Sequence, residues 1–153
     1  MYFFIENLKG CAYENISLDK NMLITYEDII GIIKEKEIFK NDNDNENTNE
    51  NIKNNENLII DTRNKESFNH MNIPGSINLP FKNFLNHDNT FKTKEEIMDI
   101  VDSFEIKDHK NVINYCGIGL TASINTFVLK ELLGFENIKL YSGSMEEYNQ
   151  NIY

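Results

Sequence analysis

The sequence has little of several features that define whole classes of protein. Only two of its 153 residues are cysteines, Cys11 and Cys116, and neither belongs to a paired motif. A disulfide framework is therefore not expected, and a reducing compartment is. Basic residues are outnumbered, 15 against 25 acidic ones, and the net charge of −10 argues against nucleic acid or an anionic membrane surface as a partner.

Long apolar runs are also absent. No stretch of the sequence approaches the roughly 20 apolar residues that span a bilayer. The first residues, MYFFIENLKG, lack the basic segment and the long apolar core that are typical of a signal peptide. We therefore expect a soluble protein of the cytoplasm, with no membrane partner.

The length fits one compact domain and is too short for two. Residues 41–57 stand apart within it, because about half of them are asparagine and only Ile52 is apolar. Such a segment buries too little surface to offset its ordering entropy, so we interpret it as a disordered insertion. Residues 1–20 match no pattern and are treated as an N-terminal arm, which leaves 21–153 as a single domain.

Short apolar runs alternate with segments of helical periodicity around this insertion. The runs with the length and composition of strands are NMLIT, NLIID, SINLP, NVINY and NIKLY. The helical segments are TYEDIIGIIKEKEIF, TKEEIMDIVDSF, TASINTFVLKELLG, which Gly134 would end, and SMEEYNQNI. Three of them open with a pair at capping-box spacing: Thr25 and Asp28, Thr93 and Glu96, Ser144 and Glu147. This alternation predicts βαβ crossovers, and hence an α/β fold whose mainly parallel sheet is covered by helices on both faces.

Cys116 ends one of the predicted strands, immediately before a predicted helix. Ligands and reacting groups gather at the carboxyl ends of such strands. The loop GIGLT that follows can curl with its backbone N–H groups inward, because glycines tolerate dihedral angles that other residues resist. Those donors and the helix dipole would stabilise an anionic sulfur and lower the pKa of the thiol. A buried structural cysteine is the alternative, but the glycine-flanked context favours a nucleophile.

Four segments in order along the chain resemble signatures of the rhodanese family of sulfurtransferases, over roughly residues 21–150. LIIDTR is similar to the family's strand with Asp-x-Arg, IPGSINLPF to its Ile-Pro-Gly segment, and YCGIGLTA to its catalytic loop. GFENIKLYSGSMEEY is similar to its last strand and Tyr-x-Gly-Ser close, with Met145 and Tyr148 where tryptophans are usual. The resemblance implies the three-layer rhodanese-like fold. The loop is most similar to the second half of tandem thiosulfate and mercaptopyruvate sulfurtransferases.

The resemblance also implies a reaction, that of a sulfurtransferase of the thiosulfate sulfurtransferase type. The Cys116 thiolate would take sulfane sulfur from a small donor of the thiosulfate or mercaptopyruvate type and hold it as a persulfide. Cyanide or a thiol, either of low molecular weight or on a thioredoxin-like protein, would then remove it, without metal or organic cofactor. Phosphatases of the same fold have an arginine six residues after the cysteine, where this chain has Ala122, so phosphatase activity is not expected.

Binding of the donor and the persulfide would fall to the loop and the Asp-x-Arg motif. The residues so implied are Gly117, Ile118, Gly119, Leu120, Thr121, Asp61 and Arg63. Asp61 would help to orient the loop, or would be a solvated carboxylate at a strand end. Arg63, the only arginine of the chain, would either contact the anionic donor or form a buried ion pair.

Departures from the family pattern leave the donor open. The loop is neutral where thiosulfate-specialised members carry basic residues, and Ile118 stands where mercaptopyruvate-specialised members often have serine. Ser67 stands about where the tandem enzymes have a second arginine, and Asn72 replaces the usual histidine. Two alternatives to the enzyme therefore remain: a rhodanese-fold binding module with weak catalysis, and a sulfur carrier that another protein loads.

The remaining candidates for chemistry are three histidines and the second cysteine. His70, His87 and His109 have no ligand spacing with one another, so a metal site is not expected. Cys11 is interpreted as an incidental thiol, the alternative being a group that resolves the persulfide.

Overall fold

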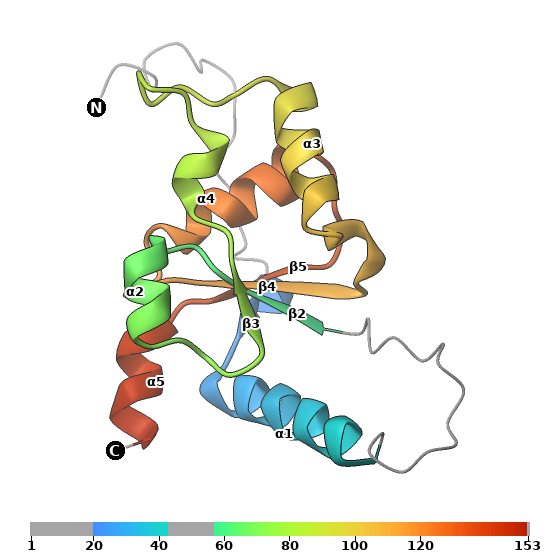
Figure 1. Ribbon diagram of the computed structural model, residues 1–153, viewed down its shortest axis with the longest axis vertical. Helices are drawn as coiled ribbons and strands as arrows, with labels where there is room; N and C mark the ends of the chain where they lie inside the picture. Colours follow the sequence, from blue (N-terminus) through green and yellow to red (C-terminus); the bar gives the residue numbers. More distant parts are fainter. Residues whose placement is uncertain (1–19, 43–56, 153) are drawn as a thin grey trace, which may run out of the picture.

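The computed structural model describes residues 20–42 and 57–152 of the chain. Its five strands form one sheet in the order β1-β5-β4-β2-β3, and every neighbouring pair is parallel. The strands are β1 (Leu23–Ile24), β2 (Asn57–Asp61), β3 (Ser76–Asn78), β4 (Asn111–Tyr115) and β5 (Ile138–Tyr141). The predicted parallel α/β fold is confirmed, and β4, which precedes Cys116, is the central strand (Figure 1).

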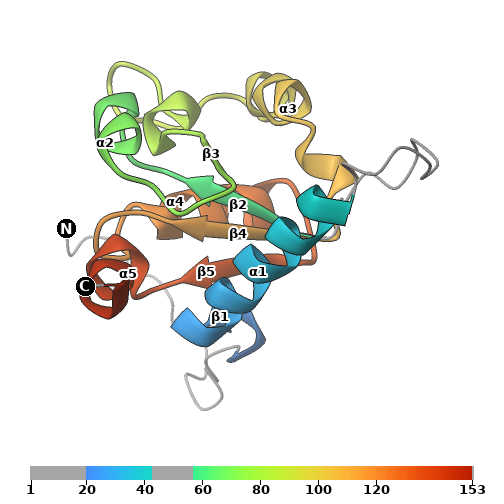
Figure 2. The ribbon, with the colours of Figure 1, turned by 60° about the horizontal axis from the view of Figure 1, so that its bottom comes forward.

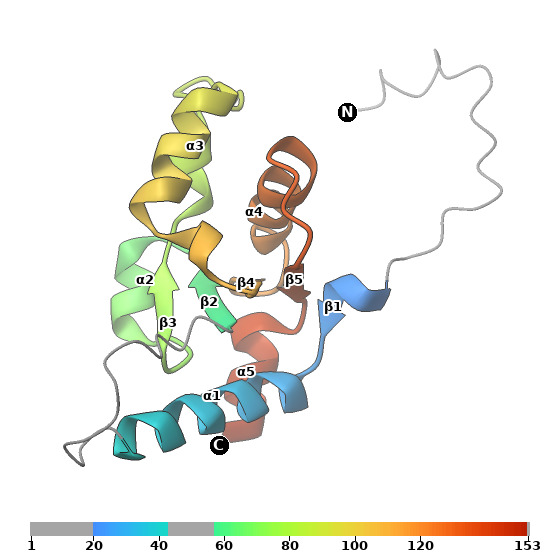
Figure 3. The same ribbon diagram turned by 90° about the vertical axis from the view of Figure 1, so that its right-hand side faces the viewer.

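Helices cover both faces of the sheet, which gives the three layers that the sequence predicts. The helices are α1 (Tyr26–Asp42), α2 (Lys65–His70), α3 (Lys94–Ser103), α4 (Ala122–Phe127), which a π-helical segment, η5 (Val128–Leu132), continues, and α5 (Ser144–Ile152). Short 3-10 turns are η2 (Lys20–Met22), η3 (Phe81–Phe84) and η4 (Ile106–Asp108). Figure 3 shows α1 and α5 on one side of the strands and α3 and α4 on the other.

The two inner strands β2 and β4 are mostly apolar because both of their faces are buried. Successive side chains of a strand point to opposite faces. In β2, Leu58 and Ile60 pack into the core beneath α3 and α4, whereas Ile59 packs into the core beneath α1 and α5. The same alternation places Val112 of β4 in the first core and Ile113 in the second. Figure 2 shows the sheet between these two layers of helices.

Several predicted helix ends are confirmed in atomic detail. The Thr25 N–H donates to the carboxylate of Asp28 over 2.8 Å, and the Asp28 N–H donates to the Thr25 hydroxyl over 3.3 Å. Thr93 and Glu96 form the same reciprocal capping box at the start of α3. At the other end of α4 and η5, Gly134 has a φ of +80°, the left-handed conformation expected of a residue that ends a helix.

The predicted insertion is too wide at both ends. Helix α1 continues through residues 41 and 42, and β2 begins at Asn57. Asn57 belongs to the sheet because it pairs with Asn111 of β4, whose side-chain amide donates to the Asn57 side-chain oxygen over 3.0 Å. Residues 43–56, and residues 1–19 with Cys11, lie outside the described residues. In the described part of the chain, no helix has the length and apolar character needed to cross a membrane.

Candidate active site

Cys116 lies at the middle of the carboxyl edge of the sheet. Its strand β4 is flanked by β5 on one side and β2 on the other, and α4 begins only six residues after it, at Ala122. The side chain is 2% exposed. The loops that follow β2, β4 and β5 at this edge of the sheet lead into α2, α4 and α5 (Figure 1).

The sulfur of Cys116 lies among hydrogen-bond donors. Burial of the thiol raises its pKa, but hydrogen bonds from the Thr121 hydroxyl and from the backbone N–H groups of Ala122, Ile118 and Thr121 lower it by more in total. The pKa of Cys116 is therefore below its ordinary value. The predicted inward-facing N–H groups and the predicted direction of the pKa shift are both confirmed.

Only one of the two loop glycines is required by the backbone. Gly119 has a φ of +84°, and a Cβ atom there would lie 2.5 Å from the carbonyl oxygen of Ser142. A Cβ atom on Gly117 would meet nothing within 4 Å. The loop therefore depends on Gly119 for its left-handed turn and for its close approach to the segment between β5 and α5.

The first turn of α5 is hydrogen-bonded to the backbone of the loop that contains Cys116. The N–H of Met145 donates to the carbonyl oxygen of Cys116 over 3.1 Å, and the N–H of Glu146 donates to that of Gly117 over 3.0 Å. The carbonyl and N–H groups of a trans peptide point in opposite directions, so the N–H groups of Gly117 and Ile118 point away from α5. The Ile118 N–H is one of the donors to the sulfur.

The capping box predicted for Ser144 and Glu147 is wrong. The spacing of Ser144 to Glu147 predicts a capping box, but Ser144 has a φ of +53°, and its hydroxyl is bound elsewhere. The hydroxyl accepts the N–H of Cys116 over 3.0 Å and donates to the carbonyl oxygen of Tyr141 over 2.9 Å. The Glu147 N–H donates instead to the carbonyl oxygen of Gly143. Ser144 thus ties the first residue of the loop to the end of β5.

Arg63 forms the buried ion pair, one of the two roles that the sequence left open. Its Nε donates to both carboxylate oxygens of Asp61 over 3.0 Å, and its Nη2 donates to Asp61 and to the carbonyl oxygen of Met71, each over 2.6 Å. The Asp61 side chain is fully buried, and that of Arg63 is 18% exposed. Burial lowers the pKa of Arg63, but the hydrogen bond and charge of Asp61 raise it, with a net increase. The pair fixes the segment between β2 and β3, so Asp61 is not a solvated carboxylate.

Thr62 is not among the residues that the sequence predicts for the site. It is fully buried, and its hydroxyl donates to the carbonyl oxygen of Tyr115 over 3.1 Å and lies 3.3 Å from the Thr121 hydroxyl. The signal that could have revealed it is its position. Asp61 is opposite Tyr115 in the register of β2 and β4, so the residue after Asp61 lies beside Cys116.

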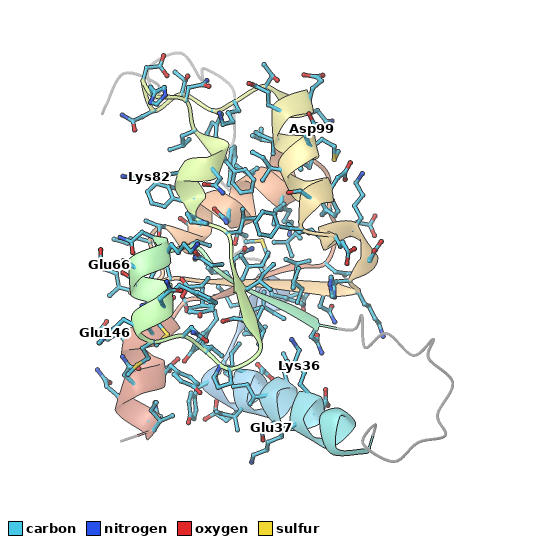
Figure 4. All side chains as sticks on the ribbon, in the orientation of Figure 1. Lys36, Glu37, Glu66, Lys82, Asp99 and Glu146 are labelled. Carbon is cyan, nitrogen blue, oxygen red and sulfur yellow. The ribbon has the colours of Figure 1, made fainter. Side chains whose placement is uncertain are left out.

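The surface around the site is partly apolar. Ile118 and Leu120 of the loop are 59% and 70% exposed. Charged side chains occur on the elements around them, and Figure 4 shows Lys82 of η3, Glu66 of α2 and Glu146 of α5 on the side of the molecule where α2 and α5 lie. The residues predicted to bind the donor therefore lie in two environments. Thr121 bonds to the sulfur, whereas the side chain of Leu120 is exposed to solvent.

These features define a parallel α/β domain with a thiol cradled at the carboxyl edge of its central strand. Residues 44–151 match the model of the rhodanese-like domain family, and the chain belongs to this family.

Relatives of known name align with half of the chain. Over 76 residues it is 45% identical to a protein of Mycobacterium bovis provisionally named thiosulfate sulfurtransferase 1, and 40% identical to the sulfur carrier protein TtuD of Thermus thermophilus. Each alignment covers 50% of this chain and 27% of the relative. The chain thus spans about a quarter of the length of these curated relatives.

Solved structures share the fold at low sequence identity. The Tum1 protein of Saccharomyces cerevisiae is 21% identical, with a TM-score of 0.62 over 88% of this chain and 45% of its own. The anaerobic ergothioneine biosynthesis enzyme of Chlorobium limicola is 18% identical, with a TM-score of 0.61 over 86% of this chain and 30% of its own. At these identities the likeness concerns the fold alone.

Proposed function

We propose that the chain is a sulfurtransferase that carries sulfane sulfur as a persulfide on Cys116. The observation that carries this proposal is the environment of the Cys116 sulfur, which accepts hydrogen bonds from one hydroxyl and three backbone N–H groups. Donors of this kind favour an anionic sulfur, and the thiolate is the nucleophilic form of cysteine. The family of the chain and the names of its relatives support the same reaction class.

The first half of the reaction loads the cysteine. The Cys116 thiolate attacks the outer sulfur of thiosulfate, a sulfur–sulfur bond forms, and the bond to the central sulfur breaks as sulfite leaves with the electron pair. With mercaptopyruvate the carbon–sulfur bond breaks instead, and pyruvate leaves as its enolate and takes up a proton. The negative charge then resides on the outer sulfur of the persulfide, where the donors of the loop can follow it.

The second half unloads the cysteine. An acceptor thiolate, or cyanide, attacks the outer sulfur, and the electron pair of the broken bond returns to Cys116 as thiolate. The products are a persulfide of the acceptor or thiocyanate. The acceptor is a low-molecular-weight thiol or a thiol on a thioredoxin-like protein, and the reducing cytoplasm is the location in which such thiols are available.

The donor is bound by neutral groups. Residues 117–121 contain no charged side chain, and the Arg63 guanidinium is bound to Asp61 and Met71. An anionic donor at Cys116 would therefore rely on backbone N–H groups and on the hydroxyl of Thr121. A site without a charged group does not select strongly by the charge of the donor, so it is consistent with thiosulfate and with mercaptopyruvate.

A second candidate function is that of a sulfur carrier or binding module loaded by another protein. The exposed apolar side chains of Ile118 and Leu120 favour it, because they offer a protein partner a contact beside the buried sulfur. The relationship to a sulfur carrier protein of Thermus thermophilus supports it as well. This candidate shares the persulfide and differs in its donor.

Intact mass spectrometry tests the proposal. The purified chain is incubated with thiosulfate and, separately, with mercaptopyruvate, beside the Cys116→Ser variant. A gain of one sulfur atom that cyanide reverses, and that the variant lacks, is the expected result. No gain with either donor, while Cys116 still reacts with iodoacetamide, would contradict the enzyme and favour the carrier or binding module.

A further inference from the structure

Thr62 has no part in the reaction described above, although its hydroxyl lies against a group that binds the sulfur. The hydroxyl of Thr62 is 3.3 Å from that of Thr121, and the Thr121 hydroxyl in turn bonds to the sulfur of Cys116. Three side chains from two neighbouring strand ends and one loop thus form a continuous row, Thr62 to Thr121 to Cys116.

The backbone holds Thr62 at the end of this row. Its N–H donates to the carbonyl oxygen of Tyr115 over 2.9 Å, and its own carbonyl oxygen accepts the N–H of Phe81 over 3.1 Å. The residue is fully buried, and a β-branched side chain has few rotamers available. The hydroxyl therefore has two acceptors within reach, the carbonyl oxygen of Tyr115 at 3.1 Å and the oxygen of Thr121.

The hydroxyl protons of Thr62 and Thr121 can be arranged in two ways that satisfy every hydrogen bond of the row. When Cys116 is a thiolate, Thr121 uses its single proton to donate to the sulfur, and the contact between the two hydroxyls needs the proton of Thr62. When Cys116 is a neutral thiol, Thr121 can donate to Thr62, and the Thr62 proton then goes to the carbonyl oxygen of Tyr115. That carbonyl oxygen keeps the N–H of Thr62 in both arrangements.

We propose that Thr62 is a positioning residue whose hydroxyl donates to Thr121 when the sulfur is anionic, so that the Thr121 proton stays directed at Cys116. Hydrogen bonds in a row polarise one another, so the donation from Thr62 strengthens the bond that Thr121 makes to the sulfur. This inference rests on the proposed function only in taking Cys116 as the reacting thiol.

The groups that bond to the sulfur are uncharged, which makes a relay of hydroxyl groups a suitable means of tuning it. Within the described residues, titratable and charged side chains do occur on the elements around the site. They are Asp61 and Arg63, which pair with each other, the buried Tyr115, and, on the neighbouring helices and turn, Lys65, Glu66, Lys82, Glu146 and Glu147.

Thr62→Val removes the hydroxyl and keeps the shape of the side chain, and Thr62→Ser, which keeps the hydroxyl, is the matched control. The pH dependence of alkylation by iodoacetamide, followed by mass on the peptide that contains Cys116, gives the pKa of the thiol. Thr62→Val is expected to raise this pKa by about half a unit, which slows alkylation about threefold below the pKa. Thr62→Ser is expected to stay within about 0.2 unit of the unsubstituted chain.

A double substitution separates the relay from a general structural effect. If Thr62 acts through Thr121, adding Thr62→Val to Thr121→Val shifts the pKa by less than about 0.2 unit. Two outcomes would overturn the proposal. One is an equal shift with and without Thr121→Val, and the other is a folded Thr62→Val variant whose Cys116 pKa is the same as in the unsubstituted chain. Thr62→Ala replaces Thr62→Val if the latter does not fold. No sulfur donor is present in these measurements, so their outcome is independent of whether the chain transfers sulfur.

Discussion

Replacing Gly119 by alanine tests whether the loop around Cys116 is held by the contact between its backbone and the segment after β5. The substitution adds a Cβ atom at a φ of +84°, 2.5 Å from the carbonyl oxygen of Ser142. That oxygen belongs to the backbone and cannot rotate away as a side chain could. Either the loop or the segment between β5 and α5 has to move by several tenths of an ångström.

Two other glycines of the chain allow the two causes of destabilisation to be separated. Gly134 has a φ of +80° and open space around its Cβ position, so Gly134→Ala adds the left-handed strain alone, about 1 kcal/mol. Gly117 has neither a positive φ nor a close neighbour, so Gly117→Ala should leave the free energy of unfolding within about 1 kcal/mol of the original. Gly119→Ala carries both the strain and the clash, and should cost about 2 to 4 kcal/mol.

Urea unfolding of the three variants gives the free energies, and the pH dependence of alkylation gives the state of the thiol. Gly119→Ala should also raise the pKa of Cys116, because moving the loop lengthens the bonds from the N–H groups of Ile118 and Thr121 to the sulfur. If Gly119→Ala and Gly134→Ala are equally destabilising, the contact with Ser142 contributes nothing. If Gly119→Ala is clearly destabilised but its Cys116 pKa is the same as in the unsubstituted chain, the loop keeps its donors in place without this contact.

Three further predictions concern Arg63, Ser144 and the thiol itself. Arg63→Lys should lower the free energy of unfolding by about 2 kcal/mol in urea titrations, because lysine cannot reproduce the forked contact with the buried Asp61; unchanged stability would contradict a structural ion pair. Ser144→Ala should be less stable than Ser144→Gly by about 1 kcal/mol, since both lose the bond to the Cys116 N–H but only glycine relieves the φ of +53°, and the reverse order would refute this account. Alkylation of Cys116 should rise with pH through a midpoint below that of a free thiol, and Thr121→Val should move that midpoint upward by about one unit; no movement would exclude the hydroxyl as a donor to the sulfur.

The parts of the fold that could be predicted from the sequence are those that local pattern determines. Short apolar runs between helical segments predict strands of a covered parallel sheet, and the spacing of Thr93 and Glu96 predicts the capping box at the start of α3. The place of Cys116 follows in the same way, because the end of a strand and the start of a helix can both be read from the sequence. Strand order and register, in contrast, depend on which strands meet, and no local pattern records them.

The capping box predicted at Ser144 is wrong for the same reason. Ser144 and Glu147 have the spacing of a capping box, but a tertiary partner, the N–H of Cys116, takes the hydroxyl and draws Ser144 into a left-handed conformation. For Arg63 the sequence left two roles open, and the structure has the ion pair, because the chain bends directly after β2 and the guanidinium bonds to Asp61. The partner of Ser144 is 28 residues away in the sequence, so its hydroxyl cannot be assigned until Cys116 has been placed beside the end of β5.

The register of β2 and β4 places Thr62, which no sequence pattern singles out, where it can influence the pKa of Cys116. Once Asp61 is opposite Tyr115, the residues that follow each of them are neighbours, and the first side chain beyond β2 lies against the loop that holds the sulfur. A hydroxyl at that position can extend the row of donors, whereas an aliphatic side chain of the same shape ends the row at Thr121. Any chain that keeps this register should therefore have a thiol pKa that depends on the residue between the aspartate and the arginine. The dependence should disappear wherever the loop lacks a hydroxyl to receive the bond.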